Sequence, residues 1–155
     1  MATFKFGLET NLSTTAVLDA ATDFSDRRPR LWPNLDPTVY KVHALAPGRA
    51  EVTEGSAVLG GIWARESYDW STPNVVRATV QESNVFQPGG TWELRATAAG
   101  GHCRLEISIC REARGVRGHV LGALMSLMGP RIHKQSLQRT LAIISKQARH
   151  PILTM

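Results

Sequence analysis

Hydrophobic and polar residues alternate along much of this chain, with the period of two that is typical of β-strands. The first such stretch is residues 3–9, in which Phe4, Phe6 and Leu8 share one face. Short turns rich in glycine, proline and asparagine separate six further stretches, at residues 38–45, 49–58, 62–70, 75–86, 91–97 and 102–111. Strands that follow one another through short turns pair antiparallel. The pattern therefore predicts an antiparallel sheet of about seven strands.

Two short helices are expected between the first strand and the second. Ser13 or Thr14 can cap a first helix that runs to about Phe24, because its hydroxyl can accept a hydrogen bond from a free backbone N–H. Pro29 then falls in the first turn of a second helix, a position that tolerates its missing N–H.

The last third of the chain changes to the helical period. Its apolar residues fall into two stripes, first Val120, Leu121, Leu124, Leu127 and Met128, and later Leu137, Leu141 and Ile144. We expect one long helix over about residues 114–148, kinked or briefly broken at Gly129-Pro130, because an interior proline removes a helical hydrogen bond.

The order of these elements predicts an α+β fold. A single open sheet has one apolar face that must be covered, and only the long C-terminal helix is long enough to cover it. We therefore expect a curved antiparallel sheet of about seven strands that grips this helix, with two short helices after the first strand. A length of 155 residues fits one domain, over residues 1–155.

Several local motifs resemble those of the START-like, helix-grip superfamily (SRPBCC), which includes polyketide cyclase/dehydrase-type and lipid-transport proteins. They are Trp32-Pro33, the GIWARESYDWS segment at 61–71, the SNVFQPG segment at 83–89, the strand from Cys103 to Arg111, and the terminal helix with Gly129. The resemblance spans about residues 3–148. It implies a hydrophobic cavity between sheet and helix. The superfamily has no shared catalytic signature, so the resemblance assigns no catalytic residue.

Composition narrows the class of protein. With 43% hydrophobic and 20% charged residues the balance is that of a globular protein. No run approaches the roughly 20 apolar residues of a membrane helix, which argues against an integral membrane protein, and the N-terminus does not read as a secretory signal. Cys103 and Cys110 would lie about 23 Å apart on one strand, too far for a disulfide. We therefore expect reduced thiols and a cytoplasmic protein.

Charge is distributed unevenly. Residues 1–112 carry 11 Lys/Arg and 13 Asp/Glu, a net charge of −2, whereas residues 113–155 carry 7 Lys/Arg and no acid, a net charge of +7. The cations are spread over 43 residues, which favours a solvated helix face over a nucleic-acid site, so we expect no nucleic-acid partner. Peripheral contact with a membrane during ligand exchange stays open, as does the choice between monomer and homodimer.

The strand at residues 62–70 decides which polar groups face the predicted cavity. A turn centred on Thr72-Pro73 pairs Asp69 with the inward-facing Val76, which places Trp63, Arg65, Ser67 and Asp69 inward. A register error of one residue would reverse this assignment. Under it, charged groups lie on an apolar face, where burial is costly unless they are paired. Glu54 and Glu82 are inward acids that could pair with Arg65.

The predicted function is to bind or carry a hydrophobic small molecule, such as a lipid, quinone, polyketide or aromatic metabolite. The alternative is a polyketide cyclase or dehydratase-type enzyme, with Arg65, Asp69, Glu82 and Tyr40 as candidates for proton transfer or polarisation. No metal site and no cofactor are expected, because the histidines are scattered and no phosphate-binding glycine motif is present. The expected ligand-binding residues are Tyr40, Trp63, Arg65, Ser67, Asp69, Val80, Trp92, Leu94, Leu105, Ile107, Leu124, Met125 and Met128.

Overall fold

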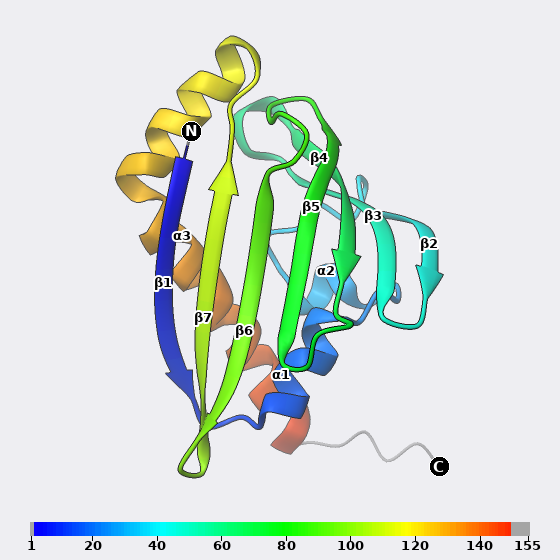
Figure 1. The fold of residues 1–155 in the computed structure, drawn as a ribbon, viewed down its shortest axis with the longest axis vertical. Coiled ribbons are helices and arrows are strands. Elements are labelled where there is room, and N and C mark those ends of the chain that lie inside the picture. Colours follow the sequence, from blue (N-terminus) through cyan, green and yellow to red (C-terminus); the bar gives the residue numbers. More distant parts are fainter. Residues whose placement is uncertain (1, 150–155) are drawn as a thin grey trace.

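The computed structural model describes residues 2–149, and within them seven strands form one antiparallel sheet with the order β1-β7-β6-β5-β4-β3-β2 (Figure 1). The strands are β1 Ala2–Thr10, β2 Lys41–Ala46, β3 Arg49–Ser56, β4 Ile62–Asp69, β5 Val75–Ser83, β6 Thr91–Ala99 and β7 His102–Arg111. The helices are α1 Thr14–Ala21, α2 Arg28–Leu31, the short 3-10 helix η1 Val58–Gly60, and α3 Gly115–Arg149. The predicted α+β architecture is confirmed.

Two strands are shorter than the alternation predicts, because side chains divert the backbone into turns. The carboxylate of Asp36 accepts hydrogen bonds from the backbone N–H and the hydroxyl of Thr38, so β2 begins only at Lys41. At the end of β5, the hydroxyl of Ser83 accepts two hydrogen bonds from backbone N–H groups of the following loop. This local turn ends the strand at Ser83.

The two short helices lie where the sequence places them. Ser13 caps α1, and its hydroxyl accepts a hydrogen bond of 3.1 Å from the backbone N–H of Ala16. Pro29 lies in the first turn of α2. α1 packs against β5, β6 and α3, so that it closes one end of the space between sheet and long helix.

α3 is one helix of 35 residues that runs diagonally across one face of the sheet (Figure 1). It continues through Pro130 without a break, so of the two predicted outcomes, a kink or a brief break, the break is wrong. Its first half also faces the opposite way from the prediction. The apolar stripe expected to pack inward is exposed on the surface, except for its buried member Leu121; the exposed members are Val120, Leu124, Leu127 and Met128.

Glycines explain this reversal. A Cβ placed on Gly118 would lie 2.3 Å from the carbonyl oxygen of Val85, and one on Gly129 would lie 3.0 Å from the ring of Phe4. α3 therefore approaches the rest of the protein through positions that carry no side chain, and this close approach turns the larger residues of the first half outward. In the second half, Leu137 and Leu141 are buried as predicted.

The main core lies between the sheet and the helices. It contains the predicted inward sets of β5, β6 and β7, among them Val76, Leu94, Leu105 and Ile107, which are almost fully buried. The buried charged residues Arg28, Glu54 and Glu66 line one cavity, next to α2 and the middle of α3.

Candidate functional site

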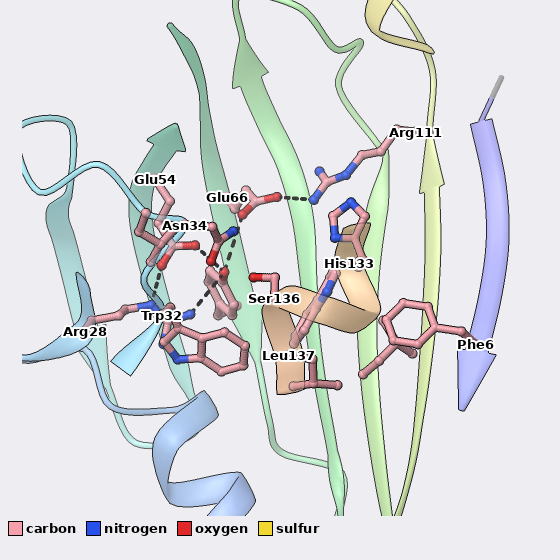
Figure 2. Close-up of a pocket in the computed structure, with 14 residues that line it drawn as sticks. Phe6, Arg28, Trp32, Asn34, Glu54, Glu66, Arg111, His133, Ser136 and Leu137 are labelled. Carbon is pink, nitrogen blue, oxygen red and sulfur yellow. Dashed lines mark hydrogen bonds and ion pairs between the residues drawn. The ribbon is translucent and has the colours of Figure 1, made fainter. Parts of the chain in front are cut away.

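A cavity of about 160 Å³ lies between the inner face of the sheet, the α2 segment and α3 (Figure 2). Its apolar wall consists of Phe6, Trp32, Trp92, Ile107 and Leu137. The indole N–H of Trp32 donates to the carbonyl of Ala20 at 3.2 Å, and its ring meets that of Trp92 edge to face, with centroids 6.4 Å apart. Three strands, β1, β6 and β7, therefore form the apolar side of the cavity together with α3 and with Trp32, which directly follows α2.

The opposite wall is a buried polar network centred on Tyr68. The guanidinium of Arg28 donates from Nε to Glu54 and from Nη2 to the Tyr68 hydroxyl at 3.3 Å. The Tyr68 hydroxyl in turn donates to Glu54 Oε2 at 2.6 Å. Arg28, Glu54 and Tyr68 are each less than a tenth exposed, so these contacts replace the water that the charged groups lose on folding.

A second ion pair continues the network towards β7. Arg111 donates from Nη2 to Glu66 Oε1 at 2.6 Å, and in Figure 2 Arg111 lies beyond Glu66, farther from Arg28 and Glu54. Two guanidinium groups and two carboxylates therefore face the same small space, with no net formal charge. A buried charge is tolerated where a partner of opposite sign is in contact.

Burial and these contacts shift two pKa values in the network. Burial raises the pKa of Tyr68 well above its ordinary value, and the neighbouring carboxylates of Glu54 and Glu66 add to the rise. Burial alone would lower the pKa of Arg28, but the attraction of Glu54 and Tyr68 outweighs it and raises the pKa instead. The phenol is therefore neutral and the guanidinium charged at neutral pH.

α3 contributes His133 and Ser136 from one turn of the helix (Figure 2). Burial lowers the pKa of His133 to about 4, and the positive charge of Arg111 adds to this shift. Its ring stands 5.4 Å from that of Phe4 on β1. Since His133 is a neutral imidazole near neutral pH, it presents a proton donor and an acceptor to the cavity.

The predicted inward orientation of Trp63, Arg65, Ser67 and Asp69 is wrong. In β4 the buried residues are Ala64, Glu66 and Tyr68, and the alternate set faces the other side of the sheet.

The turn after β4 accounts for this error. It is one residue longer than expected, with Asn74 at a φ of 64°, so Asp69 pairs with Arg77 instead of Val76. A bulge between Arg65 and Glu66 adds a second irregularity. Because side chains alternate in a strand, the shift of one residue reverses the whole set.

On the outer face, these polar residues make local contacts instead of cavity contacts. Arg65 donates to Glu51 at 2.9 Å. Asp69 accepts from the hydroxyl and the backbone N–H of Ser71, and these hydrogen bonds lower its pKa. Ser67 and Asp69 line a separate hollow over β4, β5 and β6.

The other predicted site residues are divided between the cavity, the core and the surface. Trp92 and Ile107 line the cavity. Leu94 and Leu105 lie in the main core, and Val80 and Met125 belong to a second, smaller cluster at the start of α3. The residues on the surface are Glu82, Leu124 and Met128.

The remaining predicted residue, Tyr40, is partly buried outside the cavity lining. Its hydroxyl donates to the carbonyl of Ser25 at 3.1 Å, and burial raises its pKa to about 12. Of the four candidates for proton transfer, therefore, none lines the cavity.

Sequence reasoning missed most of the polar wall, although signals for some of it are present. Arg111 continues the inward alternation of Cys103 to Ile109, and His133 lies one helical turn before the buried Leu137. Glu66 and Tyr68 required the correct register of β4. No local pattern singles out Arg28, because its partners lie 26 and 40 residues away in the chain.

Comparison with known proteins identifies the fold. No family model and no curated protein matches the sequence. Among solved structures, a START superfamily protein from Mycobacterium smegmatis superposes with a TM-score of 0.77 at 12% identity, over 93% of this chain and 97% of the other. The Zhui aromatase/cyclase from Streptomyces sp. R1128 gives 0.75 at 12% identity, over 96% of each chain. Human STARD10 gives 0.69 at 12% identity, over 96% of this chain and 66% of the other. Identities this low establish a shared fold only.

Proposed function

We propose that the protein binds and carries a small hydrophobic molecule in the cavity between the sheet and α3. The START-like helix-grip fold of the chain supports this proposal. The observation that carries the proposal is the apolar wall of Phe6, Trp32, Trp92, Ile107 and Leu137 around about 160 Å³ of space. An apolar cavity of about 150 Å³ in another protein is large enough for benzene. The cavity in this conformation therefore fits a single ring better than a long lipid chain.

A calorimetric titration with toluene tests this proposal. The wild-type protein should show saturable binding at one site. Leu137→Trp, which fills the cavity, should abolish that binding, whereas Leu45→Trp on the exposed face of β2 should retain it. A folded wild-type protein without saturable binding, or equal binding by Leu137→Trp, would contradict the proposal.

The alternative function is that of a cyclase or dehydratase-type enzyme, and the observation that favours it is the polar wall. Tyr68 holds a neutral hydroxyl between two carboxylates and a guanidinium, an arrangement that can pass a proton to a bound carbonyl. The fold is shared with an aromatase/cyclase. Tyr68→Phe should then abolish turnover of a ring-closing or dehydrating test substrate while toluene still binds. Unchanged turnover would exclude this role of Tyr68.

The exposed apolar face of α3 supports a contact with a membrane during ligand exchange. This outer stripe consists of Val116, Val120, Leu124, Leu127, Met128 and Ile132, each at least 44% exposed. Residues 113–155 contain seven Lys/Arg and no acid. Two copies of the stripe would bring cations together without a counter-charge, whereas an anionic bilayer surface supplies one. No helix in residues 2–149 is long and apolar enough to cross a membrane.

Co-sedimentation with vesicles tests this contact. The protein should bind vesicles that contain phosphatidylglycerol and not vesicles of phosphatidylcholine alone, and salt should weaken the binding. Leu127→Asn should reduce it, whereas Val58→Asn, an exposed apolar residue outside α3, should not. A dimer in solution that Leu127→Asn dissociates would assign the stripe to a second copy instead.

We also propose a cytoplasmic location for the protein, because Cys103 and Cys110 form no disulfide with each other.

A further inference from the structure

Most polar groups on the cavity wall already have partners. Arg28 donates to Glu54, to Tyr68 and to the carbonyls of Ala21 and Asp23, so each of its three nitrogens donates at least once. Glu54 receives hydrogen bonds on both carboxylate oxygens, one from Arg28 and one from Tyr68. This half of the network is complete without a ligand.

The second ion pair is the exception. Nη1 of Arg111 is a buried donor without a hydrogen-bond partner among the described residues. Glu66 is also incompletely paired. Its Oε1 accepts from Arg111, but its Oε2 has only the Tyr68 hydroxyl as a neighbour, at 3.4 Å. A phenol has one proton, and Tyr68 donates it to Glu54 at 2.6 Å. Glu66 Oε2 is therefore a buried acceptor that lacks a donor, on a side chain only 7% exposed. Burial of such an acceptor is unfavourable because it loses its hydrogen bonds to water, unless another group donates a hydrogen bond to it.

The facing turn of α3 offers further polar groups without partners. Within the described residues, neither the ring of His133 nor the hydroxyl of Ser136 forms a hydrogen bond. Both can donate or accept. Together with Glu66, and with Asn34, which also lines the cavity, they form an open hydrogen-bonding edge beside the apolar wall (Figure 2).

Charge restricts what this edge can bind. The two arginines and two glutamates that line the cavity already balance. A bound carboxylate would add an uncompensated negative charge next to Glu66, and burial of such a charge is costly. A neutral hydroxyl avoids this cost, and it can donate to Glu66 Oε2 while its oxygen accepts from Arg111 Nη1, Ser136 or His133.

We propose that the ligand of this cavity is a neutral, single-ring molecule that carries a hydroxyl group, with phenol as its simplest form, and that the hydroxyl donates to Glu66 Oε2. The ring lies against Trp92, Ile107 and Leu137, in keeping with the volume of about 160 Å³. This inference rests on the proposed function, because it names the ligand class of the same cavity.

Four matched probes test the inference on the wild-type protein by calorimetric titration: phenol, toluene, anisole and benzoate. Phenol should bind roughly 10- to 100-fold more tightly than toluene, because a hydrogen bond to a charged group contributes about that factor. Anisole, whose oxygen can accept from Arg111 Nη1 but has no proton for Glu66, should bind more weakly than phenol, and benzoate should be the weakest. If toluene binds and phenol binds no more tightly, the hydroxyl inference fails while the proposed function stands. If none of the four binds, both fail.

A variant locates the effect at Glu66. Glu66→Gln keeps the shape of the side chain but removes its charge, so the preference for phenol over toluene should fall about fivefold or more, with toluene affinity little changed. Glu106→Gln, on the exposed face of β7, should keep the wild-type preference. An unchanged preference in folded Glu66→Gln would overturn the role of Glu66. If that variant does not fold, the wild-type series still decides between hydroxyl recognition and apolar packing alone.

Discussion

Protonation of His133 should destabilise the protein as the pH falls. The pKa of this ring is about 4 in the folded protein because the ring is buried and Arg111 is near. In the unfolded chain a histidine has a pKa of about 6.5. The unfolded state therefore binds more protons than the folded state between these two values, and the free energy of unfolding decreases as the pH drops through this window.

The size of the effect follows from the difference between the two pKa values. About 2.5 units at about 1.4 kcal/mol each give a loss of about 3 kcal/mol between pH 7 and pH 4. The groups that face His133 are Phe4 on β1 and Arg111 on β7, with the carboxylate of Glu66 paired to Arg111. Neither Phe4 nor Arg111 changes its protonation in this range, so they leave the sign unchanged.

Urea unfolding at pH 7, 6, 5 and 4 measures this loss. Other groups also titrate in acid, so the quantity to follow is the difference in unfolding free energy between wild type and His133→Gln. Any stability advantage of the wild type should decrease by about 3 kcal/mol from pH 7 to pH 4. The variant His119→Gln, on an exposed part of the same helix, is the control and should follow the wild type. A difference between wild type and His133→Gln that stays constant with pH would refute the reasoning.

Three further substitutions test the packing and the buried network by urea unfolding. Glu54→Gln leaves Arg28 buried without its counter-charge and should cost about 3–5 kcal/mol, and a cost below about 1 kcal/mol would show that the pair is solvated. Gly118→Ala places a Cβ 2.3 Å from a backbone oxygen and should destabilise by about 1–3 kcal/mol, whereas Gly122→Ala, whose nearest neighbour is 3.7 Å away, should be neutral or stabilising by up to about 1 kcal/mol. An equal effect of the two would contradict the close approach of α3. Thr140→Val removes a buried hydroxyl that has no hydrogen-bond partner within residues 2–149 and should stabilise by about 1 kcal/mol, and a loss of stability would show that the hydroxyl is satisfied.

The sequence predicts the architecture because alternation, turns and capping all act locally. Ser13 caps α1, Pro29 lies in the first turn of α2, and the apolar faces of β5, β6 and β7 point inward as expected. These features depend on residues close together in the chain. The apolar face of a strand can be recognised from the alternation in its own sequence, without knowing which strands lie beside it.

The site is harder to predict because its geometry depends on single-residue shifts and on contacts distant in sequence. One additional residue in the turn before β5 reverses β4 and brings Glu66 and Tyr68 to the cavity. The partners of Arg28 come from β3 and β4, so no local pattern reveals them.

In α3, hydrophobic residues and glycines compete for the inner face. A hydrophobic stripe alone predicts the wrong face for Val120 and Leu124, because the close approach at Gly118 and Gly129 determines the packing. Backbone contact through glycine leaves no apolar signature in the sequence, so this reversal becomes visible only in three dimensions.

The central claim is that the space beneath α3 receives a small ring, and an NMR titration of methyl signals tests it most directly. On addition of toluene, the methyl signals of Ile107 and Leu137, which line the cavity, should shift in a saturable manner. Those of Val116 and Leu127, which lie on the exposed face of α3, should not. Saturable shifts confined to the exposed methyl groups, or no saturable shift in the folded protein, would contradict the account.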